Sequence, residues 1–332
     1  MYKDDKKEKI DFVILWVDGN DKEWLEEKAK YSNLNGDSSI NRFRDYDNLQ
    51  YLFRGIEKFV PWVNKIFFVT WGHIPKWMNT NNEKIVVVKH EDFIPKEYLP
   101  TFNSNVIEMN LHRIEDLSEK FVLLNDDLFI LKQVKKSDFF KKGLPRDMYI
   151  EHVKYNPSDR HKKMRRNYIN IINKYFSKKE YIKKNCFKVF NIEYGLKNFK
   201  TLINLKNEDF CDLYSPHLTQ AFLKSTFKDL WVCEETKINE ACYNKLRADN
   251  DLGVMLCRYW QLLNGRFMPS KIIGKYFDIS NNNKNIIKCI KKNKYKIICI
   301  NDSRDIIDFE KVKHEINEAF NSVLNSKSQF EI

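Results

Sequence analysis

The stretch IDFVILWV, residues 10–17, decides the fold. Seven of its eight residues are apolar, and a near-continuous apolar run of this length is typical of a strand buried on both faces of a parallel sheet. Similar runs predict further buried strands at 65–70 (KIFFVT), 84–89 (KIVVVK), 120–124 (KFVLL) and 296–300 (KIICI).

Helical patterns lie between the predicted strands of the first half of the chain. Apolar residues recur at helical spacing over 49–59 and again over 105–114. Strands that alternate with helices indicate βαβ units and right-handed crossovers. We therefore expect an α/β fold with a mostly parallel sheet flanked by helices.

The second half of the chain carries mainly helix signals. Residues 155–200 are rich in Lys and Arg at helical spacing, residues 212–263 read as helix with a break at Ser215–Pro216, and 305–325 reads as an amphipathic helix. We accordingly divide the chain into four parts: an α/β part (1–150), a basic, mainly helical insertion or cap (151–210), a helical part that returns to the core (211–304) and a C-terminal helix (305–332).

Composition excludes several classes of protein. The chain has 332 residues, of which 42% are hydrophobic, and its mean hydropathy is −0.59. Its apolar runs are shorter than the roughly 20 residues that a transmembrane helix needs, and its first residues lack a signal-peptide pattern. The seven Cys are odd in number and form no CxxC pair, which argues against a disulfide framework and a zinc site. We expect a protein of the reducing cytoplasm.

The net charge of +12 is concentrated in two segments. Residues 151–200 carry an excess of ten positive charges, and residues 281–300 contain six Lys and no acidic residue. Basic blocks of this kind bind phosphates, anionic lipid surfaces or polyanionic chains. A solvated helix surface would show the same pattern, so the charge alone leaves both interpretations open.

The acidic pair Asp126–Asp127, which follows Asn125 at the end of a predicted strand, is the strongest chemical signal. Two adjacent carboxylates repel each other, and a divalent cation such as Mg²⁺, which prefers oxygen ligands, would relieve the repulsion. Ligands of parallel sheets gather at the carboxyl ends of strands, where Asp18 also falls. A turn that caps a helix is the alternative interpretation.

Arg42, Arg44 and Asp45 precede a predicted helix, where the two guanidinium groups suit either a diphosphate clamp or a capping salt bridge. His217 lies at a predicted helix start; a neutral imidazole there can accept a proton from a hydroxyl, although a single His is more often structural.

Arg247 and Asp251 stand four apart on a predicted helix, a spacing that fits an ion pair as well as a phosphate contact. The sequence contains no GxxxxGK[ST], no GxGxxG and no Cys/His cluster, so P-loop, dinucleotide and zinc chemistry lack support. The residues by themselves therefore indicate a cytosolic, phosphate-handling α/β enzyme.

Four blocks of sequence add a family resemblance. In chain order they are IDFVILWVDGNDKEW (10–24); RFRDYDNLQYLFRGIEKFVPWVNKIFFVTWGHIPKW (42–77), continued by LPTFNSNVIEMNLHRI (99–114) and FVLLNDDLFI (121–130); PHLTQAF (216–222) with KLRADNDLGVMLCRYWQLL (245–263); and KIICINDS (296–303). They resemble the conserved regions of the Stealth family of hexose-1-phosphoryl transferases. That family includes bacterial capsule polysaccharide synthases and the animal N-acetylglucosamine-1-phosphotransferase.

The chain departs from the usual family pattern in three places. RDYDNL (44–49) stands where the family usually reads RDNGEL, WGHIP (71–75) stands where it reads NGQIP or DGQIP, and Asn110 replaces a His. Arg44, Asp45 and the acidic pair are kept. The departures therefore bear on the contacts of the 71–75 loop and on sugar selection.

The resemblance implies a glycosyltransferase-A-like fold whose sheet binds a nucleotide. It also implies a UDP-sugar donor, Mg²⁺ or Mn²⁺ as cofactor, and a saccharide or polysaccharide acceptor. An acceptor hydroxyl would attack the β-phosphorus, UMP would leave, and a sugar-1-phosphate would be joined as a phosphodiester in capsule or cell-surface polysaccharide synthesis. Residues 1–150 would then bind the nucleotide sugar and the metal, and residues 211–304 the acceptor.

The same resemblance implies roles for individual residues. His217 would be the general base, oriented by an acid such as Asp45, while Arg44 and Arg247 would stabilise charge on the diphosphate. The implied metal ligands are Asp126, Asp127 and Asp302. The implied substrate contacts are Trp16, Val17, Asp18, Asn20, Arg42, Asn103, Asn105, His112, Asn125, Asp251 and Asn301.

Two rival functions remain. A metal-dependent glycosyltransferase would use the same donor and release UDP instead of UMP. A basic polyanion-binding protein would rest on the charge of residues 151–200, but no nucleic-acid motif is present and we expect no nucleic-acid partner. Because that segment lies outside the four blocks, we expect it to act at the periphery, either by guiding a phosphate-bearing polymer or by holding the enzyme at an anionic inner-membrane surface.

Overall fold

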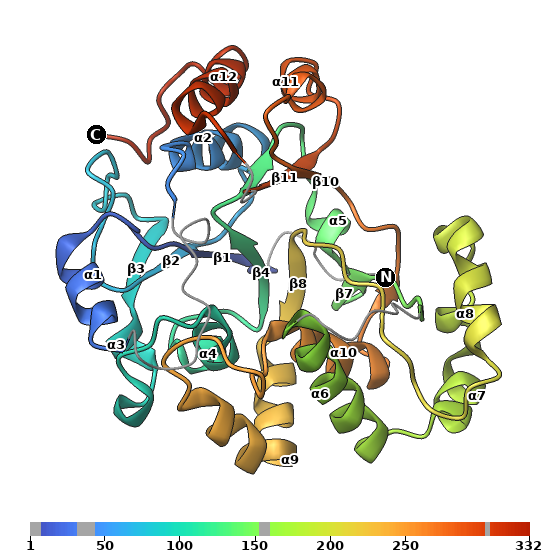
Figure 1. Cartoon of the computed structure of the whole chain (residues 1–332). Coiled ribbons are helices and arrows are strands. Elements are labelled where there is room, and N and C mark those ends of the chain that lie inside the picture. The colour runs from blue at the N-terminus through green and yellow to red at the C-terminus, as the bar shows by residue number, and fades with distance from the viewer. Residues whose placement is uncertain (1–7, 32–43, 153–159, 303–305) are drawn as a thin grey trace.

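The computed structural model describes residues 8–31, 44–152, 160–302 and 306–332, and a five-stranded sheet lies at its centre (Figure 1). The strand order is β3-β2-β1-β4-β8, with β1 to β4 parallel and β8 antiparallel to β4. The strands are β1 (Asp11–Leu15), β2 (Ile66–Thr70), β3 (Ile85–Lys89), β4 (Lys120–Asn125) and β8 (Gln220–Leu223). The expected α/β class with a mostly parallel, helix-flanked sheet is confirmed.

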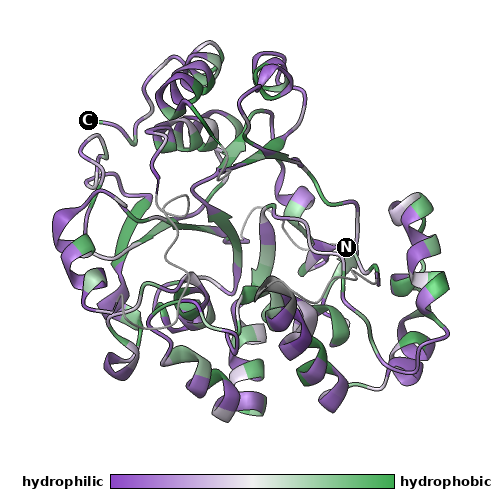
Figure 2. Ribbon diagram, viewed as in Figure 1, coloured by the Kyte–Doolittle hydropathy of each residue, from purple (hydrophilic) through white to green (hydrophobic). Residues whose placement is uncertain are grey.

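β1 lies in the middle of this sheet and is buried on both faces, as its apolar run predicts. Phe12 and Ile14 contribute to one hydrophobic core, whereas Val13 contributes to the other. Side chains alternate between the faces of a strand, so one short segment joins both cores. Figure 2 shows the central strands mostly in the hydrophobic colour.

Three helices cover one face of the sheet: α2 (Leu49–Phe59), α11 (Lys284–Lys291) and α12 (Phe309–Asn321) (Figure 1). At Gly55, α2 passes very close to the backbone of Ile130, where an added Cβ would lie 2.4 Å from the Ile130 carbonyl oxygen. Only glycine fits that approach, which packs α2 directly against the chain at Ile130.

Four further helices cover the other face: α4 (Ser104–Asn110), α6 (Arg160–Tyr175), α9 (Lys224–Cys242) and α10 (Val254–Leu263). Met109 of α4, Phe227 of α9 and Leu256 of α10 are fully buried in this second core. The molecule therefore has a helix–sheet–helix layering (Figure 1).

Two small sheets extend the core. One has the order β10-β11-β5, from β10 (Lys275–Asp278), β11 (Ile297–Asn301) and β5 (Leu128–Ile130); the other joins β6 (Phe140–Lys141), β7 (Leu144–Asp147) and β9 (Met268–Pro269). The predicted strand 296–300 thus belongs to a small sheet and not to the central one. Asp126 and Asp127 form the turn between β4 and β5, where the central sheet meets the first small sheet.

The remaining elements are short helices and an outlying helical unit. The short helices are α1 (Lys22–Ala29), α3 (His90–Phe93), η2 (Lys96–Tyr98), η3 (Leu111–Arg113) and α5 (Lys136–Phe139). The outlying unit consists of α7 (Lys178–Val189), η4 (Ile192–Lys197) and α8 (Asn198–Asn204), and it lies at the edge of the molecule (Figure 1). Among the described residues, no helix combines the length and the apolar character needed to cross a membrane.

The helical interpretation of residues 212–263 is wrong in two places. Gln220–Leu223 is the strand β8, whose pairing with β4 overrides the helical spacing, so His217 precedes a strand and not a helix. Arg247 and Asp251 lie in the loop between α9 and α10, because the Asp251 carboxylate accepts hydrogen bonds from loop and neighbouring amides instead of pairing along a helix.

Candidate active site

A cavity of about 950 Å³ opens at the carboxyl ends of β1, β4 and β11. Twelve of the residues expected at the site line it: Trp16, Val17, Arg44, Asp45, Asn105, Asn125, Asp126, Asp127, His217, Arg247, Asn301 and Asp302. They come from segments far apart in the chain, which parallel strand ends and two loops bring together.

Among the described residues, only one of the two carboxylate oxygens of Asp127 has hydrogen-bond partners. Its Oδ2 atom lies 3.1 Å from Nε2 of His217 and accepts a hydrogen bond from the Cys299 thiol at 3.2 Å. Its Oδ1 atom is buried and has no hydrogen-bond partner among the described residues. A buried, unpartnered carboxylate oxygen is costly unless a ligand completes its surroundings.

Asp126 faces the cavity from the same turn. Desolvation in the cavity, followed by the negative charges of Asp127 and Asp45, raises the pKa of Asp126 to about 7. Desolvation likewise raises the pKa of Asp45. These carboxylates mutually destabilise their charged forms, a condition that a divalent cation relieves.

The donor set fits a hard divalent cation. Asp127, His217 and Cys299 place one potential ligand atom each within 4.8 Å of one another. Burial and the Asp127 charge raise the pKa of the Cys299 thiol, so it serves Asp127 as a neutral donor rather than as a thiolate ligand. The orphaned Oδ1 of Asp127 and the neighbouring Asp126 are the oxygen ligands available at this turn.

Asp302 lines the cavity from the end of β11 but is engaged elsewhere. Nε of Arg44 donates to its Oδ2 at 2.9 Å, and the hydroxyl of Tyr46 donates to its Oδ1 at 2.7 Å. The Arg44 guanidinium also lies over the ring of Phe309 at 5.1 Å. In the described chain, the candidate ligand atoms grouped with Asp127 include neither Asp302 nor Asp126.

His217 reaches the cavity from a braced loop. Arg258 of α10 donates to the carbonyl of Tyr214 and to Oγ of Ser215, and it forms a buried ion pair with Asp147 at 2.8 Å. Burial lowers the pKa of His217, but the carboxylates of Asp127, Glu108 and Asp126 outweigh burial and raise it above the ordinary value. In this structure Asp127, and not the expected Asp45, contacts the imidazole, while Asp45 accepts from the backbone N–H of Asp47.

Arg247 is positioned by a polar cluster beneath the cavity. Its Nη2 donates to Oγ of Ser104 at 2.7 Å. Asp251, which is 1% exposed, accepts hydrogen bonds from Asn103 and Asn105 and thereby fixes the loop that carries Arg247. Asp251 and Asn103, which we expected to contact substrate, are both buried outside the cavity lining.

Three other expected contacts also lie outside the lining. His112 is buried against the rings of Phe227 and Trp231, and burial lowers its pKa to about 4. Asp18 accepts from the backbone of Asn20 in a turn after β1, so both close that turn instead of facing the cavity. Arg42, another expected substrate contact, falls outside the described residues, so that expectation stays a prediction.

The 71–75 loop packs against the turn after β1. Nε2 of His73 accepts a hydrogen bond from the backbone N–H of Asp18 at 2.7 Å, and the hydroxyl of Thr70 donates to the His73 carbonyl. The segment that departs from the family pattern thus supports the backbone next to Trp16 and Val17.

Sequence reasoning missed one wall of the cavity. Met164, Arg165 and Tyr168 of α6 line it, so part of the basic segment lies at the site and is not peripheral to it. Glu108 of α4 also lines the cavity, and burial raises its pKa. The helical spacing of α6 was the available signal, but nothing in that spacing indicated what the helix packs against.

Comparisons with known proteins identify relatives of this chain. Residues 8–36 match the model of Stealth protein conserved region 1, and residues 42–147 match that of conserved region 2. The chain is 44% identical to the capsular polysaccharide phosphotransferase WcwK of Streptococcus pneumoniae over 98% of both chains, and 37% identical to the exopolysaccharide phosphotransferase cps2G of Lactiplantibacillus plantarum over 97% of this chain and 96% of that one.

Among solved structures, the galactosyltransferase LgtC, in complex with donor and acceptor sugar analogues, matches with a TM-score of 0.39 and 10% identity, over 93% of this chain and 95% of that one. At this TM-score the likeness carries no conclusion about chemistry.

Proposed function

Because the chain belongs to the Stealth family, we propose that it transfers a sugar-1-phosphate from a UDP-sugar to a hydroxyl of an acceptor sugar, releases UMP and forms a phosphodiester. The product would be a capsular or other cell-surface polysaccharide, as in the names of its relatives. The single observation that carries the proposal is the cavity where Asp127, His217 and two Arg side chains meet.

The cationic side of the cavity suits the diphosphate of the donor. Phosphoryl transfer depends on positioning and charge neutralisation more than on covalent help from the protein. Arg44 and Arg247 would contact the diphosphate, and Trp16, Val17 and Asn301 would lie near the donor. Asp126 and Asp127, joined by Asp302 if the donor displaces its present contacts, would hold Mg²⁺ or Mn²⁺, which neutralises charge on the diphosphate when bound.

His217 would deprotonate the acceptor hydroxyl. Its contacts to Asp127 and Asn125 both use Nε2, so Nδ1 would be the nitrogen that accepts the proton. The hydroxyl oxygen attacks the β-phosphorus, the bond from that phosphorus to the bridging oxygen breaks, and UMP leaves with the electron pair. The proton passes to Nδ1, while Asp127 stabilises the imidazolium from the other side.

We place the enzyme in the cytoplasm, at the inner face of an anionic membrane. Seven Cys without a disulfide support a reducing compartment. The partners would be a UDP-sugar donor and a saccharide or polysaccharide acceptor.

The leaving nucleotide tests the proposal. Purified protein is incubated with a panel of UDP-hexoses, Mg²⁺ and an acceptor oligosaccharide, and the nucleotides are separated and quantified. UMP with a new phosphodiester is the expected result. Release of UDP would replace the proposal with a glycosyltransferase, and salt-sensitive DNA binding without any turnover would replace it with a polyanion-binding protein.

A further inference from the structure

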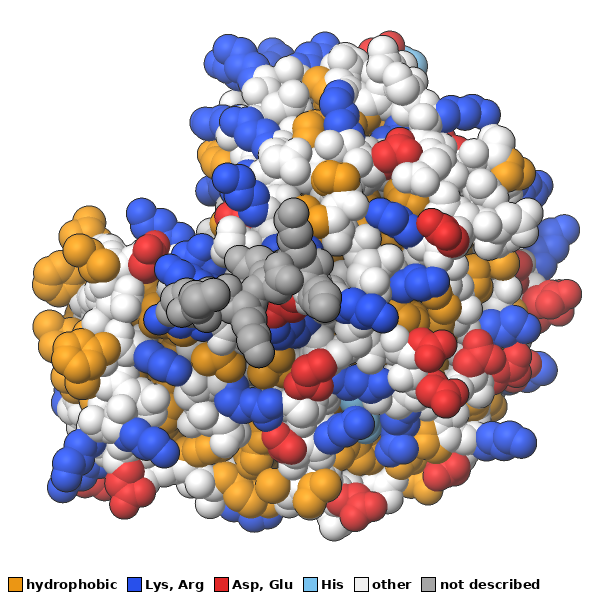
Figure 3. Space-filling model, turned by 180° about the vertical axis from the view of Figure 1, so that it is seen from behind, with side chains coloured by type: hydrophobic (Ala, Val, Ile, Leu, Met, Phe, Trp, Pro, Cys, Tyr) orange, Lys and Arg blue, Asp and Glu red, His pale blue; other side chains and the backbone are white. Residues whose placement is uncertain are grey.

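The outlying unit of α7, η4 and α8 exposes an unusual amount of apolar surface. Seven of the thirteen large hydrophobic side chains exposed in the described chain fall within residues 187–205. Ile192, Phe187 and Leu196 are 92%, 85% and 83% exposed. The others are Phe199, Leu202, Ile203 and Leu205. Figure 3 shows hydrophobic side chains gathered at the left edge, the side on which the unit lies when the molecule is seen from behind.

Lysines accompany these apolar side chains. Five exposed Lys lie in the same unit or directly beside it: Lys179, Lys183, Lys184, Lys200 and Lys206. Between residues 179 and 206 the sequence has only two acidic residues, Glu180 and Glu193. Helices that combine exposed apolar and Lys side chains are typical of surfaces that bind at a lipid interface.

The basic charge of α6 is used differently. Lys163 pairs with Asp249, and Arg165 forms an ion pair with Asp212, a side chain that is nearly buried. α6 thus uses basic side chains for contacts within the molecule. The lysines of the outlying unit face solvent beside apolar groups, so the structure narrows the candidate membrane contact from residues 151–200 to the outlying unit.

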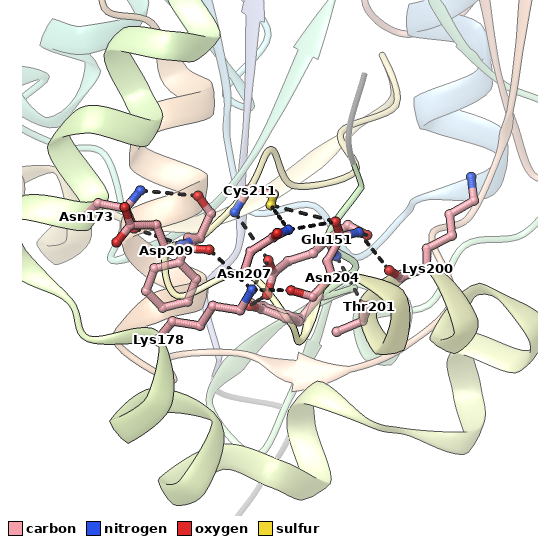
Figure 4. A network of polar contacts seen from close by, with 11 residues as sticks. Glu151, Asn173, Lys178, Lys200, Thr201, Asn204, Asn207, Asp209 and Cys211 are labelled. Atoms are coloured by element: carbon pink, nitrogen blue, oxygen red, sulfur yellow. Dashed lines mark hydrogen bonds and ion pairs between the residues drawn. The ribbon is translucent and has the colours of Figure 1, made fainter. Parts of the chain in front are cut away.

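Buried polar contacts attach the unit to the core without using its exposed apolar residues. Lys178 at the start of α7 forms an ion pair with Glu151 at 2.9 Å, and both side chains are almost completely buried (Figure 4). From α8, Thr201 accepts from the backbone N–H of Glu151, and Asn204 donates to the Glu151 carbonyl. The exposed side chains are therefore free to contact a partner while the unit stays fixed.

We propose that the outer face of α7, η4 and α8, defined by the seven apolar and five Lys side chains named above, docks on an anionic lipid bilayer. The apolar side chains would insert at the acyl boundary, while the lysines would contact anionic headgroups. A second copy of the chain is the less suitable occupant, because pairing two such faces would oppose like charges.

Docking would hold the cavity close to the membrane. α6, whose Met164, Arg165 and Tyr168 line the cavity, ends at Tyr175, and α7 begins at Lys178. The inference rests on the proposed function in that a cell-surface polysaccharide must leave through the membrane. Vesicle binding and UMP release are separate measurements, so either can fail without the other.

Flotation of the purified full chain with vesicles tests the surface. One set of vesicles contains phosphatidylglycerol and phosphatidylcholine, the other phosphatidylcholine alone. We expect binding to the anionic set that weakens with salt. The triple variant Ile192→Ser, Leu196→Ser, Phe199→Ser should bind at least about 100-fold more weakly, because it removes three apolar side chains from the contact. A second triple variant should lose the preference for anionic vesicles; it combines Lys183→Gln, Lys184→Gln and Lys200→Gln.

A matched control removes equally exposed apolar side chains elsewhere. Val232→Ser with Ile307→Ser, at positions 83% and 89% exposed, should leave binding unchanged. All variants should release UMP with a water-soluble acceptor at the wild-type rate, since none of these residues lines the cavity. The proposal is overturned if the wild-type protein does not float with anionic vesicles, or if the triple variant floats as well as the wild type. A wild-type dimer in sedimentation that the triple variant converts to monomer would also overturn it, in favour of self-association.

Discussion

Two acidic sites in this molecule have opposite surroundings. The carboxylate of Glu151, which is fully buried, accepts from the Tyr149 hydroxyl at 2.6 Å, pairs with Lys178 at 2.9 Å and accepts from the backbone N–H of Cys211 at 3.2 Å (Figure 4). At the turn after β4, Asp126 faces a cavity, and Oδ1 of Asp127 has no partner among the described residues.

A carboxylate whose partners are all within the protein contributes to the fold, whereas a carboxylate with an unpartnered oxygen is available to bind a ligand. A buried ion pair is tolerated when its hydrogen bonds are complete, and removing one partner then destabilises the native state. An incomplete acidic site costs stability unless something else binds, and such sites cluster where function needs them. Substitutions at the two places should therefore affect different measurements.

The largest effect on turnover is expected at Asp127, whose carboxylate lacks a partner for Oδ1 among the described residues. Chelation with EDTA should abolish UMP release, and Asp127→Asn should reduce it below detection, because the amide keeps the shape and loses the charge that binds the cation. The melting temperature should stay the same or rise, since repulsion from Asp126 is relieved. Asp249→Asn, on the surface, is the control. Full turnover in the chelator would contradict the metal assignment.

Removing the imidazole comes next. His217→Ala should lower turnover by on the order of 10²–10⁴-fold, with binding of the UDP-hexose by calorimetry unchanged, because a general base acts on the acceptor and not on the donor. His314→Ala, at an exposed position on α12, is the matched control. Turnover at the wild-type rate would return His217 to a structural role.

At Glu151, whose hydrogen bonds are complete, a substitution should lower stability and leave turnover unchanged. Glu151→Gln should lower the free energy of unfolding by about 3–5 kcal/mol, because it leaves the Lys178 ammonium buried without its counter-ion. Denaturant unfolding measures the loss, and turnover per folded molecule should be unchanged.

The double substitution Glu151→Leu with Lys178→Met sharpens this prediction. Replacing both charges by apolar groups should recover most of the lost stability. If the double variant is no more stable than Glu151→Gln, the hydrogen bonds to Tyr149 and Cys211 matter more than the ion pair.

A smaller effect is expected at Cys299, whose thiol donates to Asp127. Cys299→Ala should weaken Mg²⁺ binding by about 10–100-fold, since groups that orient a metal ligand have effects of that size. Calorimetry with Mg²⁺ alone measures it, and turnover should recover at saturating Mg²⁺. Cys289→Ala, a buried thiol in α11, is the control. Equal Mg²⁺ affinity in both variants would show that the thiol does not orient Asp127.

The smallest effect is expected at an exposed pair. Lys163 and Asp249 are each 55% exposed, so Lys163→Gln should change the free energy of unfolding by about 0.2–1 kcal/mol or less. The same measurement separates it from Arg165→Gln, which removes the partner of a nearly buried carboxylate and should cost more. Equal losses would mean that burial does not distinguish the two pairs.

The central strands and the acidic turn could be predicted from sequence because their signals are local. The run at 10–17 is apolar at seven of eight positions and forms a buried strand, and the Asp126–Asp127 pair closely follows another apolar run. β8 could not be predicted, since it has only four residues and its strand state depends on pairing with β4. The contact of Cys299 with Asp127 likewise depends on the pairing of β11 with β5, which no periodicity reveals.

The outer face of α7, η4 and α8 escaped sequence analysis for a different reason. Apolar residues at helical spacing usually face a core, so the pattern gave no sign that these side chains are exposed. Asp251 shows the same limit: its spacing from Arg247 fits a helix, but amides from the 103–105 segment draw it into a loop.

The attachment of the outlying unit has a consequence for segment exchange between related enzymes. The natural boundary falls between α6 and α7, because α6 lines the cavity and α7 does not. A chimera that exchanges residues 178–204 should change where the enzyme resides and leave its acceptor preference intact. Such an exchange must keep a Lys at 178, a Thr at 201 and an Asn at 204, because all three contact Glu151 in the recipient. The unit is thus a transferable module with a three-residue compatibility rule.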